Sequence, residues 1–111
     1  MRLITAVAVA VGALSIGVSA AQDKAQIAHG EKVYVAQKCS LCHSIAGKGN
    51  AKGALDGVGG KLTSEAIHEW LVKPVDAAKK ANATRKPPMK AYASLPKEDL
   101  DALVAYMASL K

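Results

Sequence analysis

The clearest pattern of apolar and polar positions lies near the C-terminus. Five apolar residues recur there at spacings of 3, 1, 3 and 3, which predicts a helix with one well-defined apolar face. Pro96 suits the first position of this helix, because the N–H that proline lacks has no helical partner there. Tyr106 lies at the edge of the apolar face. The five apolar residues are Leu100, Leu103, Val104, Met107 and Leu110.

A second periodic stretch predicts a helix that starts after Thr63 and stops before Pro74. Thr63 is a suitable N-cap, and Glu65 falls in the first turn, where the helix dipole favours a negative charge. Three apolar residues then share one side of the helix. They are Ile67, Trp70 and Leu71. Residues 75–85 are mostly charged and small, with room for another short helical turn.

The N-terminal part of the chain predicts one more helix and a long loop. Asp23 is a candidate N-cap, with Gln26 three residues on, as in a capping box. The helix then runs toward residue 39 with Gly30 inside it, which suggests that another backbone or ring packs closely there. Residues 46–60 hold six glycines and read as an irregular loop. No stretch reads as a strand, so we expect an all-α domain.

The first 20 residues are typical of a secretory signal peptide. Arg2 precedes an uncharged, Ala- and Gly-rich stretch, which ends in small residues with cleavage expected after Ala20 or Ala21. The alternative is an uncleaved membrane anchor, because the stretch is long enough to span a bilayer. With cleavage, residues 21–111 form one domain that is periplasmic or otherwise exported and has no membrane insertion.

Composition and charge narrow the possibilities further. The chain has no Phe, one Trp and three Tyr, so a short domain of this kind gains core volume from a large apolar prosthetic group. Its formal net charge is +6. Export and the absence of interleaved aromatic residues argue against nucleic acid as the partner of this basic chain.

The segment Cys39-Ser40-Leu41-Cys42-His43 has the C-x-x-C-H spacing by which c-type haem is attached. On one helical turn the two thiols and the imidazole project from one face, so two thioether bonds hold the macrocycle while His43 reaches the iron. Two other interpretations exist for a C-x-x-C pair. One is a thioredoxin-like dithiol, which is usually found in a βαβ context. The other is half of a zinc site, completed by histidines.

Four side chains are candidates for a second iron ligand. Met89 follows Pro87 and Pro88, which restrict the backbone so that the loop holds a thioether with less entropy to lose. The other three candidates are explained without iron ligation. Met107 lies on the core face of the last helix, where packing accounts for it. His29 and His68 are explained as histidines that are solvated or hydrogen-bonded.

Several segments together carry a resemblance to a known family. They extend over nearly all of residues 21–111, and in them the chain resembles the bacterial class I monohaem c-type cytochromes. The segments are Gly30-Glu31-Lys32-Val33-Tyr34, the haem motif, Leu55-Asp56-Gly57-Val58-Gly59, Leu62-Thr63, Trp70-Leu71, Lys86-Pro87-Pro88-Met89-Lys90-Ala91-Tyr92 and the run from Asp99 to Tyr106.

The resemblance implies a class I cytochrome c fold, with three to five helices around one covalently attached haem. It implies thioethers at Cys39 and Cys42, with His43 and Met89 as iron ligands. It further implies that Gly30 and Tyr34 of the first helix cross the last helix near Tyr106.

The chain departs from the family pattern at two places. Family members usually carry a proline whose carbonyl accepts the hydrogen bond of the proximal histidine, and here Gly53 and Ala54 occupy that neighbourhood. We expect a backbone carbonyl to keep this bond. Tyr34 also stands five residues before Cys39 rather than four, so we expect the first helix to end in a distorted turn.

Iron held by both His43 and Met89 has no free position for a substrate, which favours one-electron transfer between redox proteins over catalysis. We therefore expect a monomeric electron carrier and not an enzyme. The alternatives are a membrane-tethered relay of a respiratory complex and a peroxidase-like enzyme with a labile distal ligand. Six basic residues near Met89 predict partners with acidic docking surfaces. They are Lys73, Lys79, Lys80, Arg85, Lys86 and Lys90.

Overall fold

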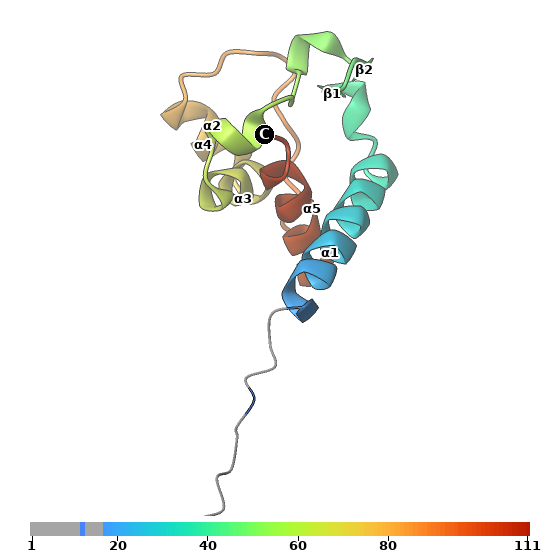
Figure 1. The fold of residues 1–111 in the computed structure, drawn as a ribbon. Coiled ribbons are helices and arrows are strands. Elements are labelled where there is room, and N and C mark those ends of the chain that lie inside the picture. Colours follow the sequence, from blue (N-terminus) through green and yellow to red (C-terminus); the bar gives the residue numbers. More distant parts are fainter. Residues whose placement is uncertain (1–11, 13–16) are drawn as a thin grey trace, which may run out of the picture.

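The computed structural model describes Gly12 and residues 17–111, and this part of the chain is mostly helical, as the patterns predict (Figure 1). Most of the expected signal segment, residues 1–20, lies outside the described residues. No helix in the described part is long and apolar enough to cross a membrane. The α-helices are α1 (Gly17–Ala36), α2 (Val58–Lys61), α3 (Ser64–Val72), α4 (Pro74–Lys80) and α5 (Lys97–Ala108).

Helix α1 differs from its prediction at the start and agrees with it at the end. The prediction that Asp23 caps this helix is wrong, because the helix already begins at Gly17. The residues just before Asp23 are mostly small and include no proline, so nothing in them interrupts helical hydrogen bonding. After Ala36 the chain turns through Lys38, whose φ of 57° is left-handed. The expected distorted turn is therefore present.

Helices α1 and α5 pack against each other (Figure 1), and Gly30 of α1 lies against Ala102 and Tyr106 of α5. A Cβ atom on Gly30 would overlap the carbonyl oxygen of Ala102 and would lie 2.7 Å from the Cβ of Tyr106. The rings of Tyr34 and Tyr106 meet edge to face, with centroids 5.8 Å apart and planes at 69°. The crossing implied by the family resemblance is confirmed. It also explains a glycine in the middle of a helix.

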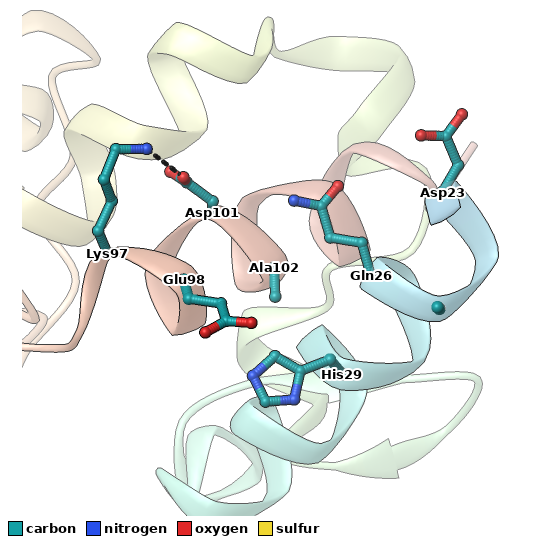
Figure 2. Close-up of a pocket in the computed structure, with 8 residues that line it drawn as sticks. Asp23, Gln26, His29, Lys97, Glu98, Asp101 and Ala102 are labelled. Carbon is teal, nitrogen blue, oxygen red and sulfur yellow. Dashed lines mark hydrogen bonds and ion pairs between the residues drawn. The ribbon is translucent and has the colours of Figure 1, made fainter. Parts of the chain in front are cut away.

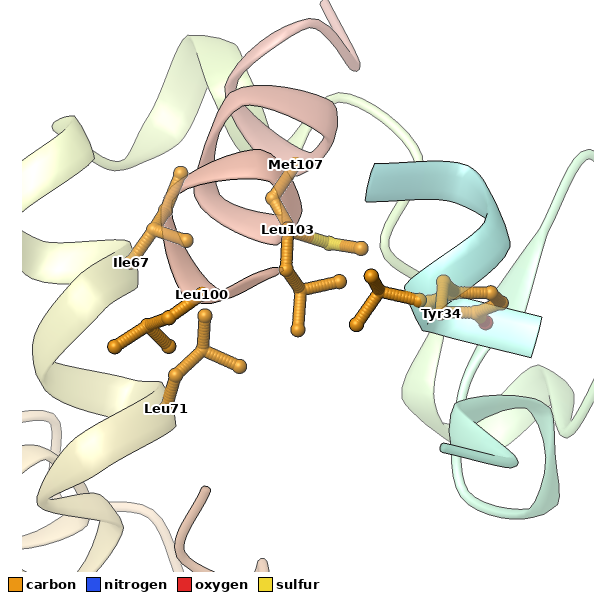
Figure 3. Close-up of a cluster of buried hydrophobic side chains, with 7 residues drawn as sticks. Tyr34, Ile67, Leu71, Leu100, Leu103 and Met107 are labelled. Atoms are coloured by element: carbon orange, nitrogen blue, oxygen red, sulfur yellow. The ribbon is translucent and has the colours of Figure 1, made fainter. Parts of the chain in front are cut away.

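The hydrophobic core joins α1, α3 and α5 (Figure 3). Leu103 of α5 is at its centre, with a side chain that is 1% exposed. Met107 is buried in the same cluster, so packing explains this residue, as the periodicity predicts. The buried cluster consists of Val33, Tyr34, Ile67, Leu71, Leu100, Leu103 and Met107.

The glycine-rich segment after the C-x-x-C-H motif contains a small hairpin, so the prediction of no strand is wrong. Strands β1 (Ser44–Ile45) and β2 (Lys48–Gly49) pair antiparallel. The two residues between them, Ala46 and Gly47, have φ values of 52° and 79°. Two positive φ values are the mark of a type I′ turn, which suits the twist of a two-residue hairpin. Strands this short leave no alternating pattern to read in the sequence.

A capping hydroxyl and two prolines mark the helix ends in the second half of the chain. The Thr63 hydroxyl accepts a hydrogen bond from the Ala66 amide at 3.1 Å, which confirms the predicted N-cap of α3. Helix α3 ends at Val72, and Pro74 occupies the first turn of α4. Pro96 is the N-cap of α5 rather than its first helical residue, a shift of one position.

Candidate functional site

The C-x-x-C-H motif forms one tight helical turn directly after α1. A short 3-10 helix covers Cys39–Leu41, and the Cys39 carbonyl accepts hydrogen bonds from the amides of Cys42 (3.1 Å) and His43 (3.0 Å). Residues three and four apart on such a turn project from the same side. The turn thus presents two thiols and one imidazole together, as the spacing predicts.

The two cysteines are free thiols in different surroundings. Cys39 is partly buried and packs against the core, whereas Cys42 is exposed. Burial raises the pKa of the Cys39 thiol from 9.0 to about 11, and the nearby Cys42 contributes to the increase. Because the thiolate is the reactive species in disulfide exchange, a raised pKa does not suit a thioredoxin-like dithiol.

The imidazole of His43 is held by a backbone carbonyl. Its Nδ1 lies 2.9 Å from the carbonyl oxygen of Gly53. A carbonyl only accepts, so Nδ1 carries the proton and Nε2 keeps its lone pair for a metal ion. Burial lowers the pKa of His43; the bond to Gly53 opposes this shift, and the Arg85 guanidinium adds to it. The expected histidine–carbonyl bond is present, with a glycine as its acceptor.

A second 3-10 helix, Ala51–Gly53, places this carbonyl. The side chain of Asn50 caps it by accepting a hydrogen bond from the Lys52 amide at 3.0 Å, and the Asn50 amide donates to the His43 carbonyl at 2.9 Å. The loop after the motif is therefore hydrogen-bonded to the motif twice, from the Asn50 amide to the His43 carbonyl and from the His43 side chain to the Gly53 carbonyl.

The segment that carries Met89 packs on the core, against which Cys39 of the motif also packs. Met89 is partly buried against the core cluster. Three residues on, the Tyr92 amide donates to the Leu71 carbonyl at 2.7 Å, which ties the segment to α3. Burial raises the pKa of the Tyr92 hydroxyl, and Cys39 and Cys42 add to the shift, so this ring lies close enough for their charge to act on it. In the sequence, Tyr92 stands only as the last residue of the Lys86–Tyr92 segment of the family resemblance, and no local pattern gives it a role.

The remaining histidines have other surroundings. Nε2 of His29 lies 2.7 Å from Asp99 Oδ1, a contact that joins α1 to α5. Figure 2 shows His29 facing the first turns of α5, in a groove that Glu98 and Asp101 also line. His68 is exposed on α3. His29 therefore contributes to the contact between α1 and α5.

The residues of the site fit a covalently attached haem. Two free thiols stand on one turn, beside an imidazole whose Nε2 is available. The Met89 thioether is partly buried against the same core that Cys39 packs on. Sulfur and imidazole nitrogen are the axial donors of low-spin c-type haem iron, and the thiols are the atoms that form its thioether bonds.

Comparison with known proteins agrees with this chemistry. The family described as Cytochrome c matches residues 27–111. Cytochrome c oxidase subunit 2 of Alkalihalophilus pseudofirmus is 31% identical over 91 residues, which are 74% of this chain and 25% of that protein. The chain thus spans a quarter of the length of that relative. No solved structure matches the chain significantly. The family match covers most of the chain and includes the haem motif, so the chain belongs to the cytochrome c family, whose members carry a covalently bound haem c.

Proposed function

We propose that this protein is a small exported electron carrier with one haem c, attached through Cys39 and Cys42 and ligated by His43 and Met89. The observation that carries the proposal is the hydrogen bond from His43 Nδ1 to the Gly53 carbonyl, 2.9 Å long, on the C-x-x-C-H turn of a cytochrome c domain. It fixes the imidazole with its ligating nitrogen free. Electron transfer by haem is supported at the level of the family.

Each residue of the site has a distinct role in this proposal. Bound haem supplies an iron that accepts and releases one electron. Cys39 and Cys42 fix the ring by two covalent bonds, and the Gly53 carbonyl orients His43. The bond from Tyr92 to Leu71 holds the segment that follows Met89. With protein ligands on both sides, the iron offers no position to a substrate, so the proposal does not include an enzyme activity.

We further propose that residues 1–20 direct export and are removed, which leaves a monomer in the periplasm or an equivalent compartment. The proposal rests on the charge and apolar pattern of these residues and on their small-residue end. Export also suits the chemistry of the site, since a haem gives the two adjacent thiols a stable fate in an oxidising compartment.

The proposed docking surface is the basic face around the Met89 segment. All six of its basic residues are exposed, and five of them form no ion pair within the described part of the chain. Lys80 is different, because its Nζ lies 2.7 Å from Glu69 Oε1. The five are Lys73, Lys79, Arg85, Lys86 and Lys90. Positive charge beside the segment that bears a haem ligand would steer acidic redox partners toward the haem.

A second candidate function is a relay domain of a respiratory complex. The relay function is favoured by the likeness to cytochrome c oxidase subunit 2. The 91 matched residues make up only a quarter of that protein, so they are one region of a larger oxidase subunit. In this second function the N-terminal segment stays in the membrane and the haem domain passes electrons within a complex.

Intact mass and peptide mapping of the protein purified from an exporting host test the proposal. We expect a chain that begins at residue 21 or 22, with one haem retained after acid-acetone extraction on the peptide that holds Cys39 and Cys42. Extraction of all colour into the solvent would refute covalent attachment. Haem on a chain that keeps residues 1–20 and sediments with membranes would favour the relay.

A further inference from the structure

Arg85 reaches from the loop between α4 and α5 to the loop that holds His43. Figure 1 shows the loop after α4 running across to the segment that follows β2. A Cβ atom on Gly53 would overlap Nη1 of Arg85 and the Cys42 carbonyl oxygen, and it would lie 3.0 Å from His43 Nδ1. The guanidinium, the end of the haem motif and the imidazole therefore converge on one face of Gly53.

The cation on Arg85 is not compensated by a carboxylate. Within the described part of the chain, the ion pairs use His29, Lys80 and Lys97. Arg85 instead lies against a glycine backbone whose missing side chain makes room for it. A planar guanidinium suits this position better than an ammonium, because it packs flat against a peptide and is more weakly hydrated.

We propose that Arg85 is a positioning residue of the haem site: its guanidinium clamps Gly53 so that the carbonyl keeps its hold on His43, and its charge raises the reduction potential of the iron. This inference rests on the proposed function.

The contact between Arg85 and Gly53 matters because the residue that holds His43 is a glycine. Gly53 has more backbone freedom than any other residue type, so its carbonyl needs a neighbour to keep it in place. The Cys42 carbonyl and the His43 imidazole border the face of Gly53 that would carry a side chain, and the Arg85 guanidinium packs beside them on this same face. Loss of the guanidinium would let the carbonyl move and would weaken the bond to Nδ1.

The electrostatic part follows from the change of charge on reduction. The reduced site carries one positive charge fewer than the oxidised site, so a nearby fixed cation favours the reduced form. Arg85 and Lys86 are both exposed, but Nη1 of Arg85 lies against Gly53 beside the imidazole of the proposed iron ligand, a position for which Lys86 has no counterpart among the contacts of Gly53. Solvent screens a distant surface charge far more than a charge held at the ligand. Arg85 should therefore matter more than Lys86.

The experiment compares Arg85→Gln, Arg85→Lys and Lys86→Gln in purified holoprotein, with two readouts. The midpoint potential is measured by spectroelectrochemistry, and the solvent exchange of the His43 Nδ1 proton is measured by NMR. We expect Arg85→Gln to lower the potential more than Lys86→Gln and to speed the exchange of the Nδ1 proton. Arg85→Lys, which keeps the charge without the planar clamp, should keep most of the potential and still speed the exchange.

Two results separate the possible failures. Equal shifts of potential for Arg85→Gln and Lys86→Gln, with unchanged proton exchange in both Arg85 variants, would overturn the role of Arg85 while leaving the carrier function intact. A parent protein that shows no reversible one-electron reduction would instead refute the proposed function. If Arg85→Gln yields no holoprotein, Arg85→Lys decides: proton exchange as slow as in the parent would overturn the clamp.

Discussion

Replacing Gly30 by alanine tests the crossing of α1 and α5. The new methyl group would overlap the carbonyl oxygen of Ala102, and it would lie 2.7 Å from both the carbonyl carbon of Ala102 and the Cβ of Tyr106. Two of these atoms belong to the backbone of a helix, so they cannot move aside by changing a rotamer. The two helices must separate instead, which loosens the edge-to-face contact of Tyr34 and Tyr106.

Two effects of opposite sign set the magnitude. Overpacking against backbone atoms costs about 3 kcal/mol, and the better helix propensity of alanine returns about 1 kcal/mol. We expect the free energy of unfolding to fall by about 2 kcal/mol. For a domain of this size, that loss lowers the melting temperature by about 8–16 °C. Gly30→Val should cost more, because valine adds further volume and is a poorer helix former.

Thermal unfolding of the holoprotein, followed by circular dichroism, measures the effect. Gly60→Ala is the matched control, because Gly60 also lies in a helix, α2, and a Cβ there would meet no atom within 4 Å. The control should be neutral or slightly stabilising. Equal melting temperatures for Gly30→Ala and Gly60→Ala would refute the close crossing.

Three further predictions concern the ligand, the docking surface and alkaline stability. Met89→Ala should abolish the weak far-red sulfur-to-iron band of the oxidised protein and let the iron bind cyanide; an unchanged spectrum would move the ligand elsewhere. Charge reversal of two lysines beside Met89 should flatten the salt dependence of electron exchange with an acidic partner more than reversal of two lysines on α1; equal effects would mean that only net charge matters. The pairs are Lys86 with Lys90 and Lys24 with Lys32. Burial raises the pKa of Tyr34 from 10.0 to about 12, so the folded state keeps a proton that the unfolded state loses, and stability should fall between about pH 10 and 12. Tyr34→Phe should flatten that fall in pH-dependent melting curves.

The sequence was most informative where one short segment carries its own chemistry or period. The C-x-x-C-H spacing predicts a helical turn, and the turn is present. The apolar period of α5 predicts the buried face that holds Leu103 and Met107. The Thr63 cap could be read because a cap depends on residues only three apart. In each case the cause lies within one short, continuous segment of the chain.

The features that sequence reasoning missed depend on tertiary contacts or on backbone conformation. The hairpin after the haem motif arises from two positive φ values at Ala46 and Gly47, and alanine gives no hint of its own. Arg85 looked like one of several surface charges until the fold brought it against Gly53, more than thirty residues away in sequence. Tyr92 likewise acquires its place through the backbone bond to Leu71.

The visible absorption spectrum of the purified holoprotein, oxidised and reduced, tests the central claim most directly. One covalent haem c ligated by His43 and Met89 predicts a low-spin spectrum in both states, one haem per chain, and a far-red band in the oxidised state that disappears on reduction. The spectrum should not change when cyanide or azide is added at modest concentration, because both axial positions are filled. A high-spin oxidised spectrum that responds at once to these anions would contradict the account, since it would show an open iron rather than an electron carrier.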